Sequence, residues 1–146
     1  MTPRWVIEEL IPHRAPFLLV SEITDLEPGV AASGVWRLTG EEWFFKGHFP
    51  GRPTLPGVLL VESMAQLGAA AVLADLRYAD RLPLFGGIDH ARFRRQVTPG
   101  DELEMSVTLR RMSSKGGSGH GEATVAGQRA GEADFFFMLV PRLISS

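Results

Sequence analysis

The stretch from Gly57 to about Leu76 constrains the fold more than any other part of the chain. It has no proline, is rich in Ala, Leu and Met, and would span roughly 30 Å as an α-helix. Its apolar residues cover every side of that helix, which is typical of a helix that is buried all round. Gly68 in its middle costs about 1 kcal/mol relative to alanine, so we expect a close backbone neighbour there, such as one from a second subunit. The stretch predicts one long helix with other elements wrapped around it.

Strand patterns fill most of the remaining chain. Before the helix we expect a short helix over 5–10, a strand over 17–26 closed by a Pro28-Gly29 turn, and a strand over 31–38. Residues 102–112 alternate apolar and polar, as in a sheet with one wet face. Further strands are expected over 84–93, 120–125 and 129–140, with KGGSG at 115–119 as a flexible joint. Since no repeat or linker divides the chain, we predict one α+β domain over 1–146, with five to six antiparallel strands around the helix.

Composition narrows the classes of function. The chain has no cysteine, which excludes disulfides, thiolate nucleophiles and zinc-thiolate sites. A net charge of −2 indicates no global attraction to nucleic acid or anionic membranes, so any basic site must be local. The N-terminus lacks the pattern of a secretory signal, and polar residues interrupt the apolar stretch 57–74. We expect a cytoplasmic protein that does not insert into membranes.

The stretch GHFPGRPTLPGVLLVESMAQ, residues 47–66, joins a stiff loop to the long helix. His48 lies in a loop constrained by three prolines and flanked by glycines, which hold a side chain in place. The first helix amides, at Gly57, Val58 and Leu59, are expected to lack intrahelical partners. Together with the positive end of the helix dipole, they form a site for a developing oxyanion.

Glu62 follows on the second turn of the helix, with Gln66 one turn further on the same face. Apolar neighbours favour a raised pKa for the Glu62 carboxyl, as a proton donor needs. A base, an acid and an oxyanion site suit removal of a proton next to a carbonyl while a β-hydroxyl leaves as water.

Structural roles also fit the same residues. His48 could cap a backbone carbonyl, Glu62 could lie at a solvated helix margin, and Gln66 could satisfy a neighbouring backbone group. A metal site is disfavoured, because the four histidines show no ligand spacing and no second carboxylate lies one turn from Glu62.

Residues 47–66 resemble the signature of bacterial 3-hydroxyacyl-[acyl carrier protein] dehydratases of type II fatty-acid synthesis. IPHRAPFLLV near the start, GIDHARFRRQVTPGD after the helix and GEADFFFML near the end resemble the same family. The resemblance implies a hot-dog fold and a homodimer, which in this family often assembles into a trimer of dimers. It also implies that His48 and Glu62, from opposite subunits, form the active site.

Further expectations follow from the resemblance. The Gly57 and Val58 amides would bind the thioester carbonyl, Gln66 would support Glu62, and Phe49 would contact the substrate. His48 would remove the α-proton and Glu62 would protonate the departing hydroxyl, without a metal or redox cofactor. Glutamate at position 62, where the isomerising relatives carry aspartate, implies dehydration without isomerisation.

The substrate would arrive on the phosphopantetheine arm of acyl carrier protein, which is acidic. Arg92, Arg94 and Arg95 are the expected docking residues, although a solvated sheet face would carry the same arginines. The chain departs from the family pattern at Ser63, at His90 and in KGGSGHG, which leaves acyl-chain length and carrier docking open. The alternatives are a hot-dog acyl-CoA thioesterase and a non-catalytic acyl-chain binding protein.

Overall fold

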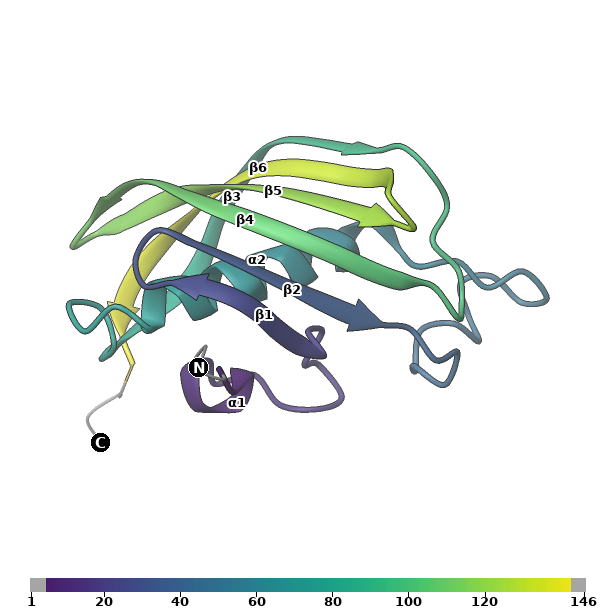
Figure 1. Ribbon diagram of the computed structural model, residues 1–146, viewed down its shortest axis with the longest axis horizontal. Coiled ribbons are helices and arrows are strands. Elements are labelled where there is room, and N and C mark those ends of the chain that lie inside the picture. The colour runs from purple at the N-terminus through teal and green to yellow at the C-terminus, as the bar shows by residue number, and fades with distance from the viewer. Residues whose placement is uncertain (1–4, 143–146) are drawn as a thin grey trace.

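The computed structural model describes residues 5–142, and these residues form one antiparallel sheet that curves over a long helix (Figure 1). The strand order is β1-β2-β4-β5-β6-β3. This is the α+β, hot-dog arrangement that the sequence predicts. The helices are α1 (Ile7–Leu10) and α2 (Gly57–Leu73), and the strands are β1 (Glu22–Glu27), β2 (Ala31–Arg37), β3 (Arg81–Phe93), β4 (Glu102–Ser113), β5 (Gly116–Val125) and β6 (Gln128–Pro141). No helix within 5–142 combines the length and hydropathy needed to cross a membrane.

Helix α2 is buried along most of its length, as its apolar composition predicts. Met64, Leu67 and Ala70 are fully buried between the sheet and the N-terminal segment, whereas Val58 in the first turn is 72% exposed. The expectation of a backbone neighbour at Gly68 was wrong, because the nearest atoms to a Cβ there belong to side chains of the same chain, with Val107 of β4 at 3.1 Å. The helix therefore supplies the rigid axis to which the rest of the chain is fitted.

Several boundaries differ from the predicted ones, and β3, for example, begins at Arg81 and not at Leu84. The strand predicted over 17–26 begins only at Glu22, because polar side chains of α2 bind the backbone of residues 17–19 in place of a neighbouring strand. Helix α2 ends at Leu73 and not near Leu76, and the carbonyl of Ala71 in its last turn also accepts a hydrogen bond from the amide of Gly29.

The KGGSG segment was wrongly predicted to be a flexible joint, since its residues 116–119 belong to β5. Its glycines accommodate close neighbours. A Cβ on Gly119 would lie 3.0 Å from the ring of Phe135, and one on Gly117 would lie 2.5 Å from the sulfur of Met112. Glycine here admits large side chains from neighbouring strands, which is a packing role and not a source of mobility.

Strand β3 lies at the end of the sheet and presents apolar side chains to solvent. It pairs with β6 on one side only. Leu84, Phe85, Ile88 and Phe93 are each between 41% and 51% exposed. An unpaired strand edge with exposed apolar residues is a surface that proteins usually cover.

Candidate active site

The loop before α2 holds His48 by its ring and by its backbone. The carbonyl of His48 accepts a hydrogen bond from the Thr54 amide at 2.7 Å, and its ring Nδ1 lies 2.8 Å from the Thr54 carbonyl oxygen. Because a carbonyl oxygen only accepts, Nδ1 carries the proton in the neutral ring and Nε2 keeps its lone pair. The half-buried ring also stacks on Phe49, with 4.1 Å between ring centroids. The loop thus presents a histidine with a free basic nitrogen.

The start of α2 leaves two amides available. Within the described residues, the amides of Gly57 and Val58 have no hydrogen-bond acceptor. The Leu59 amide was wrongly predicted to be free, because it donates to the Pro56 carbonyl at 3.0 Å. A Cβ on Gly57 would lie 2.8 Å from the ring of Phe93, so glycine is required for this close packing. The helix start therefore offers the Gly57 and Val58 amides to an anionic atom.

His48 and Gly57 line the same hollow, which we call the loop pocket. Leu60 and Phe93 form its apolar side, and Arg94 and Arg95 lie at its polar side. The complete lining also includes Thr54, Leu55, Gln96 and Val97. A basic nitrogen and the helix start thus face one space within a single chain.

Glu62 is held by Gln66, which is itself fully committed. The Gln66 Nε2 donates to Glu62 Oε2 at 3.0 Å and to the Phe17 carbonyl at 2.9 Å, while its Oε1 accepts from the Leu19 amide at 2.8 Å. Burial raises the pKa of the Glu62 carboxyl above its ordinary value, and the Gln66 hydrogen bond acts in the opposite direction. The result is an oriented carboxyl group with a pKa above its ordinary value, as the sequence predicts.

Glu62 and Gln66 line a second hollow, the helix pocket, with a volume of about 160 Å³. Its floor comes from the small residues of α2, and its walls come from β3 and β6. The other lining residues are His13, Ala65, Gly68, Ala69, Val72, Pro83, Leu84, Phe85, Phe135 and Phe137. Apart from His13, this is an apolar site beside a carboxyl group, which suits a hydrocarbon chain.

The two pockets share no lining residue and open on different sides of α2. Leu60 lines the loop pocket and Glu62 lines the helix pocket. Because these positions are two residues apart in the sequence, their side chains point in directions that differ by roughly 200° around the helix axis. A single chain therefore does not bring His48 and Glu62 to one space.

The other predicted site residues have mixed placements. Phe49 stacks on His48 but lines neither of the two pockets. Arg94 donates to Glu132 at 2.5 Å, Arg95 donates to Gln128 at 3.0 Å, and Arg92 donates to His90 at 3.1 Å. Arg94 is thus neutralised by a direct ion pair, and Arg95 lies in a longer ion pair with Asp101 at 3.9 Å.

Two features were not predicted from the sequence. His13 lies in the helix pocket with Nε2 3.9 Å from Glu62 Oε2. Ser63, a departure from the family pattern, is fully buried and donates to the Leu19 carbonyl at 2.6 Å. Both belong to contacts between α2 and the N-terminal segment, which no local pattern reports.

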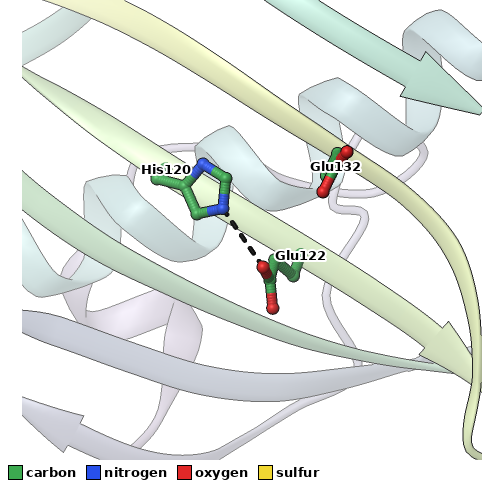
Figure 2. A group of neighbouring side chains, drawn as sticks. All are labelled: His120, Glu122 and Glu132. Carbon is green, nitrogen blue, oxygen red and sulfur yellow. Dashed lines mark hydrogen bonds and ion pairs between the residues drawn. The ribbon is translucent and has the colours of Figure 1, made fainter.

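One group of side chains on the sheet has the composition of a metal site. His120 and Glu122 of β5 and Glu132 of β6 offer ligand atoms within 4.8 Å of one another (Figure 2). The sheet creates this group from residues without any ligand spacing in the sequence.

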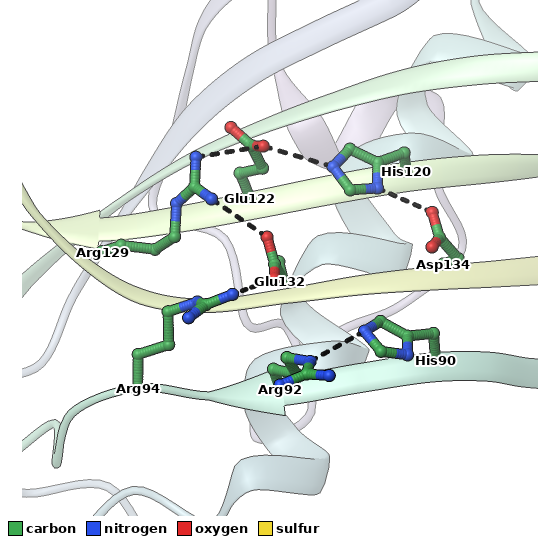
Figure 3. A network of polar contacts seen from close by, with 8 residues as sticks. All are labelled: His90, Arg92, Arg94, His120, Glu122, Arg129, Glu132 and Asp134. Carbon is green, nitrogen blue, oxygen red and sulfur yellow. Dashed lines mark hydrogen bonds and ion pairs between the residues drawn. The ribbon is translucent and has the colours of Figure 1, made fainter.

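The side chains of this group already form ion pairs and hydrogen bonds with charged neighbours (Figure 3). Arg129 contacts Glu122 and Glu132, and Arg94 contacts Glu132 as well. A hydrogen bond to Asp134 at 2.6 Å raises the pKa of His120, whereas a metal ligand must be unprotonated. The contacts thus favour a charge network that joins β5, β6 and the residue after β3 over a cation site.

Most of the chain is similar to members of one protein family. Residues 11–134 match the model of the FabA-like domain. A relative from Clostridium botulinum (strain Okra), named 3-hydroxyacyl-[acyl-carrier-protein] dehydratase FabZ, is 47% identical over 91% of this chain and 92% of its own length. A relative with the same name from Thermomicrobium roseum is 46% identical over 96% of this chain and 94% of its own.

Solved structures share the fold at lower identity. A chain of the dehydratase heterocomplex ApeI:P from Xenorhabdus doucetiae superposes with a TM-score of 0.81 at 19% identity, covering 95% of this chain and 94% of that one. A hypothetical thioesterase with coenzyme A from Streptococcus pneumoniae gives a TM-score of 0.64 at 10% identity, covering 82% and 85%. At these identities the similarity of the structures shows the fold alone.

Proposed function

The chain belongs to the FabA-like family, and we propose that it is a 3-hydroxyacyl-[acyl-carrier-protein] dehydratase of fatty-acid synthesis with His48 and Glu62 as its catalytic pair. It converts (3R)-3-hydroxyacyl-[acyl carrier protein] to the trans-2-enoyl thioester and water. The observation that carries the activity is the 46–47% identity to dehydratases over nearly the full length of both chains. Acyl carrier protein is therefore the partner that delivers the substrate.

The chemistry of the proposed pair follows from its contacts. The free Nε2 of His48 takes the α-proton, while the Gly57 and Val58 amides stabilise the negative charge on the thioester oxygen. Glu62, protonated, gives its proton to the β-hydroxyl, which leaves as water. Each step uses a group whose hydrogen bonds leave the required atom free.

Because one chain holds His48 and Glu62 in different pockets, the proposed site needs a second copy of the chain. Strand β3 connects the two pockets, since Phe93 at its end lines the loop pocket and Pro83 to Phe85 near its start line the helix pocket. In an antiparallel pair of β3 strands, the start of one strand lies beside the end of the other. Such a pair would place His48 of one subunit opposite Glu62 of its partner.

The same argument gives the position of the twofold axis. For residue 84 of one strand to face residue 93 of the other, the axis must pass midway between them, beside Ile88 and Asp89. Ile88 is exposed in the single chain, as are the apolar residues on either side of it. A C₂ dimer through β3 would bury this surface and extend the sheet. Assembly of such dimers into a hexamer and a cytoplasmic location stay predictions.

The activity is tested with purified protein and a 3-hydroxyacyl thioester of acyl carrier protein. Dehydration yields a conjugated enoyl thioester and no free thiol, which ultraviolet absorbance and a thiol reagent measure in one sample. Release of free thiol without enoyl product would establish the thioesterase alternative. Binding of the acyl carrier without either product would establish the non-catalytic alternative.

We also propose that Arg92 and Arg95 contact the acidic carrier. Arg95 lines the loop pocket beside His48, and Arg92 lies on the same strand end without a carboxylate partner among the described residues. Arg94 is paired with Glu132 at 2.5 Å, so its charge is less available than that of Arg95, whose contact with Asp101 is longer at 3.9 Å. Exposed charges of this kind mainly steer association and make it dependent on salt.

Charge reversal of this pair, R92E with R95E, is expected to raise KM for carrier-linked substrate on the order of tenfold and to reduce its salt dependence. The kcat for a short pantetheine thioester should be unchanged, because that substrate lacks the carrier. Reversal of two exposed cations elsewhere, K115E with R142E, changes the net charge equally and is the matched control. Equal KM values in the two variants would assign docking to another surface.

A further inference from the structure

His13 faces the carboxyl group of Glu62 inside the helix pocket. Its Nε2 lies 3.9 Å from Glu62 Oε2, with the two side chains 27% and 19% exposed. This separation is too long for a hydrogen bond and too short for an intervening water, so a small rotation of either side chain closes it. The two groups are thus direct neighbours.

The backbone around His13 is fixed by Arg14. The Arg14 guanidinium donates to the carbonyls of Glu8, Ile11 and His13 at 2.7–2.9 Å. On the other side of His13, Gln66 and Ser63 of α2 bind the backbone of residues 17–19. The N-terminal segment therefore holds the imidazole against α2 at a defined place.

Hydrogen bonding does not account for the position of His13. Its Nδ1 is buried and has no hydrogen-bond partner among the described residues. A histidine with a purely structural role normally binds a neighbour through a buried ring nitrogen. Burial, and secondarily the charge of Arg14, lowers the pKa of His13, so the resting ring is neutral. What remains is a neutral imidazole whose other nitrogen faces a carboxyl group.

The proposed reaction creates a need for such a group. When Glu62 gives its proton to the leaving hydroxyl, a carboxylate remains in the helix pocket and must be protonated again before the next turnover. Gln66 donates a hydrogen bond to it but cannot release a proton. Among residues 5–142, His13 is the one other titratable side chain that lines this pocket. Arg14 adds a fixed positive charge nearby, which lowers the pKa of His13 and so favours the neutral ring between turnovers.

We propose that His13 is a positioning residue that acts through Glu62, by returning the proton that Glu62 loses in each turnover. The new carboxylate attracts positive charge and favours protonation of His13 by solvent. The imidazolium then transfers its Nε2 proton to Glu62 Oε2, which restores a neutral pair. The α-proton leaves through His48, so one proton enters and one leaves per cycle. This inference rests on the proposed function.

The variant His13→Gln tests the proposal, because an amide fills much of the same space and can donate to Glu62 but cannot carry a proton. In the proposed mechanism Glu62 starts protonated, so the first turnover should keep its rate constant within about twofold of wild type. The steady-state kcat should fall about tenfold or more, because each later turnover waits for a proton. Rapid-quench measurement of enoyl product separates the two rates. Added imidazole buffer should restore kcat in proportion to its concentration.

The matched control is His120→Gln, the same substitution on the outer face of the sheet, which should change neither rate. A kcat for His13→Gln equal to that of wild type would overturn the proposal. Equal slowing of the first and later turnovers would also overturn it, since that is the result of a structural role. If His13→Gln does not fold, His13→Asn is measured in the same way with the same interpretation. Failure of the proposed function is distinct, because wild-type protein would then form no enoyl product.

Discussion

Replacement of His48 by alanine is expected to lower kcat for dehydration about 10²- to 10⁴-fold, the usual contribution of a general base. The variant loses the nitrogen that takes the α-proton. The loop itself should keep its conformation, because the backbone hydrogen bonds from Thr54 to His48 and from Leu55 to Val97 do not involve the imidazole. Enoyl formation from a carrier-linked 3-hydroxyacyl thioester gives the rate, and a thermal melt confirms the fold.

Two further measurements restrict the interpretation of this result. His120→Ala removes an imidazole on the outer face of the sheet and should retain full activity. Exchange of the α-proton of bound substrate with solvent should also be lost in His48→Ala, because exchange needs the base but not the departure of the hydroxyl. Retention of more than about a tenth of wild-type turnover would remove His48 from the role of base.

The sequence predicts the fold well where one property decides the outcome. Apolar residues on all sides of α2 require a surrounding sheet, and alternation over 102–112 specifies a strand with one wet face. The errors arise where distant side chains decide. Gln66 and Ser63 bind the backbone of residues 17–19, which therefore joins no strand. The room that Gly117 and Gly119 leave for Met112 and Phe135 is equally invisible in the local sequence.

The groups of the candidate site could be named from the sequence, and the resemblance implies that two subunits share them, but no local pattern gives their contacts within one chain. Residue types and spacing single out His48, the helix start and Glu62, and burial raises the pKa of Glu62 as expected. The contact of His13 with Glu62 depends on how the N-terminal segment crosses α2. That His48 and Glu62 open on different sides of α2 follows from helical geometry only once the contacts of Leu60 are known. Composition gives no such information.

Mixed dimers provide the second large expected effect. A dimer of one His48→Ala subunit and one Glu62→Gln subunit, isolated through two different affinity tags, should regain about half of wild-type activity. In the proposed dimer, the His48 of the second subunit meets the Glu62 of the first, which leaves one intact site and one site without either group. Homodimers of each variant should remain at or below about one hundredth of wild type. The gain over both parents is thus at least about fiftyfold.

A second mixed dimer reverses the expectation. When wild type is paired with a subunit that carries both substitutions, each shared site loses one group, so activity should stay at the level of the inactive parents. If each chain instead used its own His48 and Glu62, this dimer would keep one intact site and about half of the activity, and the first mixed dimer would have none. The mixed dimer that one model predicts to be active is thus the one that the other model predicts to be inactive. An error in protein concentration or folding cannot reverse the two results in this way. The outcome decides whether β3 pairing brings the two pockets together.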